Sequence, residues 1–320
     1  PVQCMPEDYE KYRGRFMEGW DVLRTKRLAK QKRMGLVPQN TKLTPRPKNI
    51  PAWNSLSKKK QNEMDAIMST YAGMIDRVDQ NIGKIVRHLE QTEELENTII
   101  FFLSDNGGEA ETGPLGQFQF KNLGIYGKGG NKYGKGWASL SNTPFREYKH
   151  FAHQGGIQTP LIVHWPKGIP SGNPNRILSQ FGYLPDLVET CLEVTRAKRP
   201  QKKNGRTIPI SDGISFVKAL QGSKAPLHTK PIFIEHEGNR IAREGKWKLV
   251  SYANKPWELF NMEVDRSEIN DLAAQQPSIV RHLSNAYTKW AKRVGVVDWN
   301  VARNYSVYRA KKKKTSTKQK

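Results

Sequence analysis

An apolar run that stops abruptly at an acid, an amide and two glycines constrains the fold of this chain most. Residues 98–103 are rich in Ile and Phe, and Ser104-Asp105-Asn106-Gly107-Gly108 follows them directly. A short apolar run that is polar only at its ends is typical of a parallel strand buried on both faces. Because open α/β sheets bind ligands at the carboxyl ends of their strands, the pattern predicts a functional loop after residue 103.

The two polar residues after this run offer hard oxygen donors. The carboxylate of Asp105 and the amide carbonyl of Asn106 suit Ca²⁺ or Mg²⁺, and the glycines allow the backbone to turn sharply behind them. The same residues are also typical of an ordinary Asx turn. Local sequence therefore leaves two interpretations open, a metal-binding loop and a plain turn.

Composition narrows the class of protein. The chain has 320 residues, enough for one large domain or two unequal ones. No apolar run approaches the ~18 residues that a membrane span needs, so we expect no span. The cysteines Cys4 and Cys191 are too few for a disulfide framework and lack metal-ligand spacing. We interpret both as ordinary thiols.

The formal net charge of +23 is unevenly placed. Lysines and arginines cluster in residues 24–33, 196–206 and 310–320. Such clusters favour polyanions through long-range attraction and counterion release. Solvated loops and a disordered tail are the alternative interpretation. We expect no nucleic-acid partner, because no binding motif with interleaved base-stacking aromatics is present.

Hydrophobic periodicity predicts helices ahead of the central strand. The pattern indicates one helix over residues 7–35 and a long amphipathic helix over residues 58–91. Helix, short turn and buried strand then form half of a βαβ unit. The Gly-rich segment 108–141 is too polar for us to expect it in a core. Residues 161–164 form a second short apolar run, which predicts another buried strand.

Beyond Pro226 the pattern changes to an antiparallel sheet. Alternation and close turns predict strands at 231–235 and 257–262, with a hairpin over 239–251 between them. A helical pattern over 276–294 follows. We therefore divide the chain into an α/β part (1–225), a small α+β subdomain (226–300) and a basic tail expected to be disordered (301–320).

Several segments, taken in order, resemble arylsulfatases of the formylglycine-dependent sulfatase family. The resemblance covers nearly the whole chain, and the combined pattern is far more specific than any single segment. The matching segments are Ser104-Asp105-Asn106-Gly107-Gly108, Trp137-Ala138, Asn142-Thr143-Pro144-Phe145-Arg146 with Lys149, Gly155-Gly156-Ile157-Gln158-Thr159-Pro160, Arg243-Glu244-Gly245-Lys246-Trp247-Lys248-Leu249, Glu258-Leu259-Phe260-Asn261 and Asn270-Asp271-Leu272-Ala273.

The resemblance implies both a fold and a chemistry. The fold would be an alkaline-phosphatase-like, mostly parallel α/β sheet between helices, with its N-terminal part missing here, plus a small C-terminal antiparallel subdomain. The activity would be sulfate ester hydrolysis at one Ca²⁺, bound by Asp105 and Asn106. Lys149 would be the catalytic, substrate-binding residue, because a compact ammonium offsets charge on sulfuryl oxygens. A surface ammonium is the alternative for Lys149.

Three histidines receive weaker support from the resemblance. His150 and His153 stand just ahead of the second strand, where they either line the site or have structural roles. His236 resembles a residue near the mouth of the family's pocket. We predict substrate contacts for His153 and His236.

The sequence departs from the family at the nucleophile. The family makes formylglycine from Cys or Ser within C/S-x-P-x-R, but Cys4-Met5-Pro6-Glu7-Asp8 lacks the Arg and Cys191 has neither Pro nor Arg in place. We therefore expect the nucleophile and the remaining metal ligands upstream of this chain. The chain alone is then expected to be inactive.

The predicted function is that of the C-terminal portion of an arylsulfatase-like sulfuric ester hydrolase. Its substrate would be a sulfated small molecule or a sulfated polysaccharide. One alternative is a phosphomonoester or phosphonate hydrolase of the same superfamily, and another is a non-catalytic polyanion-binding homologue. The resemblance also implies a periplasmic or secreted protein. The natural ester and the oligomeric state stay open.

Overall fold

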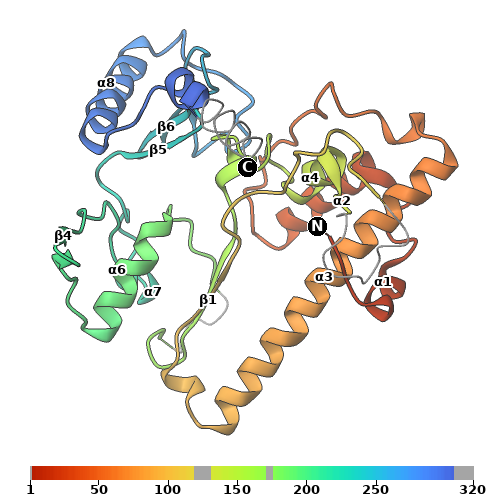
Figure 1. Cartoon of the computed structure of the whole chain (residues 1–320), viewed down its shortest axis with the longest axis horizontal. Coiled ribbons are helices and arrows are strands. Elements are labelled where there is room, and N and C mark those ends of the chain that lie inside the picture. The colour runs from red at the N-terminus through yellow and green to blue at the C-terminus, as the bar shows by residue number, and fades with distance from the viewer. Residues whose placement is uncertain (1, 119–130, 171–175, 306–320) are drawn as a thin grey trace, which may run out of the picture. The chain divides into compact units, whose positions relative to one another are not determined.

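The computed structural model describes residues 2–118, 131–170 and 176–305 (Figure 1). The chain divides into two compact units, the first comprising Pro1–Lys149 and Gln154–Leu227, and the second His150–His153 and His228–Lys320. Over the described ranges, no helix has the length and apolar character needed to cross a membrane. Of the basic tail predicted as disordered over residues 301–320, residues 301–305 are helical, and the rest lies outside the described residues.

The first unit is mainly helical. Its long helix α3 confirms the helix predicted over the same residues, and the cap is the Ser57 hydroxyl, which accepts from the Lys60 N–H. The elements are α1 (Pro6–Tyr12), α2 (Gly19–Arg33), α3 (Lys58–Gln91), β1 (Ile100–Leu103), α4 (Gly134–Ser141), α5 (Gln154–Ile157), β2 (Leu161–His164), α6 (Leu184–Thr195), β3 (Lys202–Lys203), β4 (Arg206–Thr207) and α7 (Val217–Leu220), with 3₁₀ turns at Trp53–Ser55 and Leu95–Asn97.

The single helix predicted over residues 7–35 is wrong, because the chain breaks between α1 and α2. Gly14 and Gly19 adopt φ values of +81° and +75°, which turn the backbone out of the helix. The buried Asp65 carboxylate of α3 accepts from the N–H groups of Gly14 and Phe16, each at 2.9 Å. Tertiary hydrogen bonds from α3 thus replace the helical ones lost at the break.

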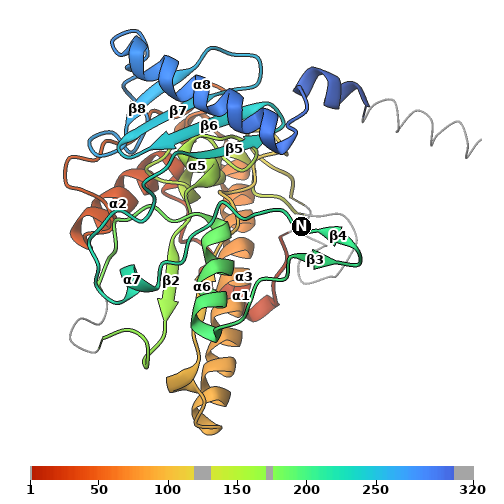
Figure 2. The ribbon, with the colours of Figure 1, turned by 90° about the vertical axis from the view of Figure 1, so that its left-hand side faces the viewer.

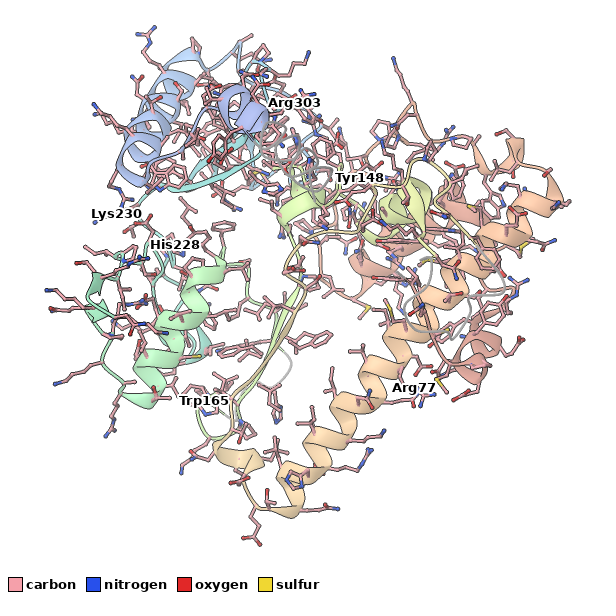
Figure 3. The ribbon with its side chains drawn as sticks, in the orientation of Figure 1. Arg77, Tyr148, Trp165, His228, Lys230 and Arg303 are labelled. Carbon is pink, nitrogen blue, oxygen red and sulfur yellow. The ribbon has the colours of Figure 1, made fainter. Side chains whose placement is uncertain are left out.

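Side-chain ion pairs fasten α1 to α3. Arg77, labelled on α3 in Figure 3, donates to Asp8 Oδ2 and Glu7 Oε1 at 2.7 Å each. Gly73 of α3 faces α1 at the same place, where an added Cβ would lie 3.0 Å from the Asp8 backbone. The close approach therefore depends on a small residue in the middle of α3.

The expectation that residues 108–141 lie outside the core is wrong for their C-terminal part. Residues 134–141 form α4, and Trp137 on this helix is fully buried against Trp20 and Trp53, with ring centroids 5.2 and 5.5 Å apart. Gly136 permits this packing, because a Cβ there would lie 2.7 Å from the Trp20 ring. Gly136 thus reflects close packing of the indoles rather than an open loop.

Strands β1 and β2 pair antiparallel, with Ile100 opposite His164 and Leu103 opposite Leu161. We predicted parallel strands buried on both faces, and that prediction is wrong for this pair. The chain returns to β2 without crossing over the sheet, so the second strand runs in the opposite direction. Phe102 and Ile162 lie opposite each other on one face of this pair and are 45% and 60% exposed, because that face is only partly covered.

The two faces of the β1–β2 pair have different neighbours within the first unit. On one face, Phe101 and Val163 pack against a cluster centred on Phe216 beside α7, which Trp165 (Figure 3) also joins. The other face and α3 line an apolar groove of about 450 Å³. The strand residues in this groove are Ile100, Phe102, Ile162 and His164.

The second unit is an antiparallel sheet covered by one helix, as predicted. Strands β5 (Ile232–His236), β6 (Asn239–Glu244), β7 (Trp247–Ser251) and β8 (Glu258–Asn261) follow one another in sheet order. Helix α8 (Pro277–Val294) lies along the sheet (Figure 2) and contributes Leu283 and Tyr287 to its core. The α/β class with a C-terminal antiparallel sheet is thus confirmed.

Candidate active site

The predicted metal loop directly follows β1. Asp105 is exposed, and among the described residues its carboxylate has no ion pair or hydrogen bond. The side-chain amide of Asn106 donates to the Gly107 carbonyl at 2.7 Å. That bond fixes the Nδ2 side of the amide against the backbone, so the Oδ1 side is the one available to a cation.

Close backbone packing fixes the position of this loop. The Gly107 N–H donates to the Gly156 carbonyl at 2.9 Å. A Cβ on Gly107 would lie 1.7 Å from the Gly155 carbonyl oxygen, and a Cβ on Gly155 would lie 2.2 Å from that of Glu147. Only glycine fits at both positions, which explains why the loop and the Gly155-Gly156 turn carry the residues they do.

The segment that carries Lys149 is hydrogen-bonded to the same loop. The Lys149 N–H donates to the Gly108 carbonyl at 3.0 Å, and the Gly108 N–H donates to Asn142 Oδ1 at 2.9 Å. The Asn142 amide also donates to the Glu147 carbonyl at 2.9 Å. Backbone hydrogen bonds therefore bring the Asp105-Asn106 loop and the Lys149 segment together.

Two residues near Lys149 were not predicted from the sequence. Glu111 lies 3.4 Å from Lys149 Nζ, and the two side chains are 51% and 42% exposed. An exposed pair of this kind contributes about 0–1 kcal/mol, so another anionic group can replace the carboxylate at little cost. Asn142 acts by holding the loop. The sequence placed Asn142 between a helix and a proline, which indicates a turn. Its hydrogen bonds to Gly108 and Glu147 could not be predicted, because they depend on the tertiary structure.

Burial anchors the residue before Lys149. Tyr148 (Figure 3) is only 4% exposed, and burial raises the pKa of its phenol well above the ordinary value, with Glu147 adding to the effect. The phenol stays neutral at physiological pH. Tyr148 is therefore a fixed point from which the Lys149 side chain extends, rather than an acid that takes part in chemistry.

The histidines predicted to contact substrate lie in the second unit. His153 is fully buried there, with Nε2 3.4 Å from Glu258 Oε2 and its ring packed on Tyr252. His236 is exposed at the end of β5, where it meets His150 and Glu237. Substrate contacts for His153 and His236 stay predictions.

The residues of the metal loop fit part of a Ca²⁺ site. A free carboxylate on Asp105 and an amide oxygen on Asn106 are hard donors on adjacent residues of a rigid loop. Ca²⁺ takes about 6–8 oxygen ligands, so these two residues supply a minority of the set. The loop is compatible with the predicted role of Asp105 and Asn106 but does not complete the site.

Comparison with known proteins identifies the family. The family model described as Sulfatase matches residues 1–197. The chain belongs to the sulfatase family. An uncharacterized sulfatase of Schizosaccharomyces pombe is 32% identical across 98% of this chain and 60% of the relative. An arylsulfatase of Klebsiella aerogenes is 32% identical across 52% of this chain and 38% of the relative.

Solved structures show the same fold. The crystal structure of Ps i-CgsB in complex with k-i-k-neocarrahexaose matches 82% of this sulfatase chain with a TM-score of 0.53 and 25% identity. The match covers 46% of that protein. The chain thus spans between about two fifths and three fifths of the length of these proteins.

Proposed function

We propose that the protein carrying this chain hydrolyses sulfuric esters in the manner of an arylsulfatase. The observation that carries the proposal is the hydrogen-bonded packing of the Asp105-Asn106 loop against the Lys149 segment, through Gly108 and Gly156. Membership of the sulfatase family supports the assignment. The resemblance noted in the sequence would place the protein in the periplasm or outside the cell.

Asp105 and Asn106 would hold one Ca²⁺, which would offset negative charge on the sulfate oxygens when bound. Lys149 would leave Glu111, 3.4 Å away, and place its ammonium against the sulfate group and the oxygen that leaves. Asn142 would keep the loop in register by accepting from Gly108. In this scheme Lys149 is the catalytic residue and Asn142 is a positioning residue.

The nucleophile has no counterpart in this chain. No C/S-x-P-x-R motif occurs in the sequence, and the Cys4 thiol is buried with its pKa raised to about 11, chiefly by burial and then by Asp8 and Glu7. Such a thiol is a poor nucleophile near neutral pH. We infer that a formylglycine, together with further metal ligands, comes from sequence of the natural protein outside this chain.

The substrate class we favour is a sulfated saccharide. The oligosaccharide bound by Ps i-CgsB supports this choice over a simple aryl ester. In the first unit the hairpin β3–β4 pairs Lys203 with Arg206 and presents Lys202 beside them, and all three are exposed. A solvated basic hairpin attracts a polyanionic chain.

Part of the basic cluster at residues 24–33 is structural. Arg24 is 3% exposed and donates to the Thr44 carbonyl and hydroxyl at 2.9 and 2.8 Å. Arg27 donates to the Leu140 carbonyl at 3.0 Å, near the C-terminal end of α4. These two arginines satisfy backbone carbonyls, so they do not belong to a surface for polyanions.

Kinetics of the natural gene product with 4-methylumbelliferyl sulfate tests the proposal. Lys149→Ala should lower kcat by roughly 10² to 10³, the effect of removing one electrostatic donor. Asp105→Ala should abolish activity and Ca²⁺ binding measured by calorimetry, since a hard-cation site loses both charge and a ligand. Lys135→Ala, in the first turn of α4, is the matched lysine control and should be unaffected.

Two results would contradict the proposal. Unchanged kcat in Lys149→Ala would remove Lys149 from the reaction. Faster turnover of 4-methylumbelliferyl phosphate than of the sulfate would favour the phosphoester hydrolase instead.

A further inference from the structure

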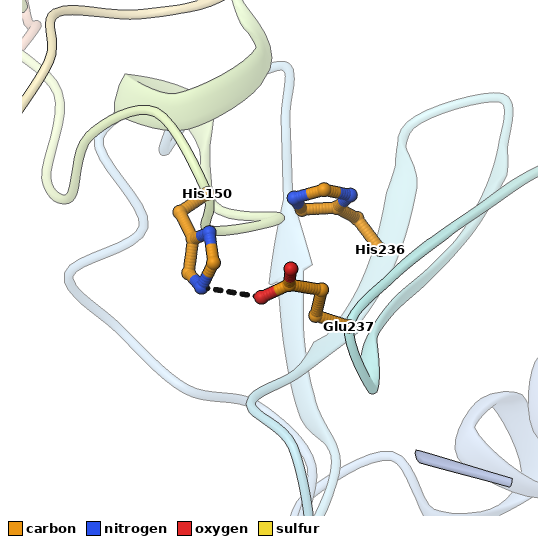
Figure 4. Close-up of side chains that lie close together, drawn as sticks. All are labelled: His150, His236 and Glu237. Carbon is orange, nitrogen blue, oxygen red and sulfur yellow. Dashed lines mark ion pairs between the residues drawn. The ribbon is translucent and has the colours of Figure 1, made fainter. Parts of the chain in front are cut away.

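Two imidazoles and one carboxylate meet at the tip of the β5–β6 hairpin (Figure 4). One ligand atom from each of His150, His236 and Glu237 lies within 4.8 Å of the other two. His150 Nε2 is 2.8 Å from Glu237 Oε2, and the two imidazole rings are 5.2 Å apart and nearly perpendicular. No second group of three His, Cys, Asp or Glu side chains in the described part of the chain comes together in this way.

A buried amide fixes the backbone of both histidines. Asn239 is 4% exposed, and its side-chain NH₂ donates to the His150 carbonyl at 3.2 Å and the His236 carbonyl at 3.0 Å. One rigid group therefore holds segments that are far apart in sequence. The distance between the backbones of the two histidines is therefore fixed by the fold of the second unit.

Glu237 occupies a turn position that its residue type does not favour. The pairing of His236 with Asn239 leaves Glu237 and Gly238 as a two-residue turn, with φ values of +50° and +83°. Positive φ at both positions suits Asn-Gly, Asp-Gly or Gly-Gly. His150 also has a positive φ, +93°. Two of the three clustered residues thus hold strained backbones, as is common at functional sites.

We propose that His150, His236 and Glu237 form a binding site for one divalent transition-metal cation, of the Zn²⁺ class. Two imidazoles with one carboxylate are a preferred donor set for such cations. Tetrahedral ligands about 2.1 Å from a cation stand roughly 3.4 Å from one another. Small side-chain rotations reach this geometry from the observed separations, opening the His150–Glu237 contact and drawing His236 inward.

A cation can reach this cluster from solvent, and three ligands leave one coordination position open. The side chains of His150 and Glu237 are 41% and 38% exposed. Three protein ligands leave the fourth tetrahedral position to water or to an oxygen of a bound molecule. The site uses different residues and a softer donor set than the Ca²⁺ loop at Asp105 and Asn106, so it stands whether or not the proposed function holds.

A second histidine–glutamate pair provides a matched control. His282 Nε2 lies 2.7 Å from Glu244 Oε2, with side chains 62% and 38% exposed. This pair resembles His150–Glu237 in distance, but it has no second imidazole nearby. If the cluster at the hairpin is only a surface ion pair, mutations in the two pairs should have the same effect on the affinity for Zn²⁺.

Calorimetric titration of Zn²⁺ tests the site. The sample is the natural gene product with Cys191→Ser, which removes the exposed thiol; it is first stripped of bound metals with a chelator and then supplied with excess Ca²⁺. We expect one equivalent to bind. His236→Ala and Glu237→Gly should each lower the Zn²⁺ affinity by roughly tenfold or more. Mutating a residue that only hydrogen-bonds to a metal ligand already lowers metal affinity by roughly this factor. His282→Ala should leave the affinity unchanged.

Glu237→Gly keeps the test independent of folding, because glycine suits the turn better than glutamate does. Its melting temperature without metal should be no lower than that of the parent. With Co²⁺ in place of Zn²⁺, the parent should show the visible absorption of a four-coordinate ion, and the variant should not. Equal affinity in the parent, His236→Ala and Glu237→Gly, or no binding by the parent, would overturn the proposal.

Discussion

Strands in the first unit and strands in the second carry similar apolar residues but bury them to different extents. Phe102 of β1 and Ile162 of β2 are 45% and 60% exposed, whereas Leu249 of β7 and Leu259 of β8 are fully buried. The second unit has four paired strands with a helix across them, while β1 and β2 are a two-stranded sheet. Two strands alone are marginally stable in water.

The difference in burial indicates that the sheet of the second unit has a complete core, whereas the β1–β2 pair does not. Helix α8 closes the second sheet with Leu283 and Tyr287. In the first unit, the face of β1 and β2 toward α3 lines an apolar groove of about 450 Å³ instead. We therefore expect the second unit to resist unfolding and the β1–β2 pair to open first.

The largest expected effect concerns a buried ion pair of the second unit. Lys248 Nζ lies 2.5 Å from Glu268 Oε1, and both side chains are almost wholly buried. Lys248→Ala should lower the free energy of unfolding by about 3–5 kcal/mol, because Glu268 is left as a buried charge without this partner. Urea unfolding followed by tryptophan fluorescence measures it.

Two further variants control that experiment. Lys255→Ala, at an exposed lysine of the same unit, should stay within about 0.5 kcal/mol of the parent. Lys248→Met combined with Glu268→Leu should recover most of the loss, since it removes both charges. A small change in the free energy of unfolding for Lys248→Ala would show that water reaches the Lys248–Glu268 pair and that the core of the second unit is not fully closed.

The next effect contrasts one aliphatic residue from each unit. Leu283→Ala removes a fully buried side chain and should cost about 2–5 kcal/mol, whereas Ile162→Ala, at a 60% exposed position, should cost about 0.5 kcal/mol or less. Thermal unfolding of this chain measures both. Ile162→Ala should also be measured in the natural gene product. A loss of unfolding free energy near that of Leu283→Ala would show that another segment covers β2 there.

The smallest effect concerns thiol reactivity within the first unit. Cys4 is 8% exposed beside α1 and α3, and burial raises its pKa from 9.0 to about 11, while Cys191 is exposed. At pH 9, iodoacetamide should label Cys191 and spare Cys4 until urea is added. Because the folded pKa is the higher one, the stabilising contribution of Cys4 is complete below pH 9 and is lost as the pH rises toward 11.

Equal labelling of both cysteines in the native chain would contradict this picture. It would show that the corner formed by α1 and α3 is as open as the β1–β2 face. The first unit would then be loosely packed throughout rather than at one surface.

Elements with local sequence signals could be predicted without the structure. The 3.6-residue period predicted α3 at its observed limits and α8 within one residue, and alternation with close turns predicted the antiparallel sheet of the second unit. The loop Asp105-Asn106 and Lys149 were likewise identified as candidates before the structure, because each lies in a specific run of residues. Backbone hydrogen bonds bring the two segments together at Gly108, while the roles of their side chains stay predictions.

Features that depend on residues far apart in the chain could not be predicted from local patterns. The Asp65 carboxylate ends α1 and starts the turn toward α2, and Trp20 makes a Gly-rich segment part of the core. The direction of β2 relative to β1 depends on how the connecting segment returns. Glu237 meets His150 because Asn239 binds the backbones of both histidines. A local pattern carries no information about such contacts, since their partners are chosen by packing.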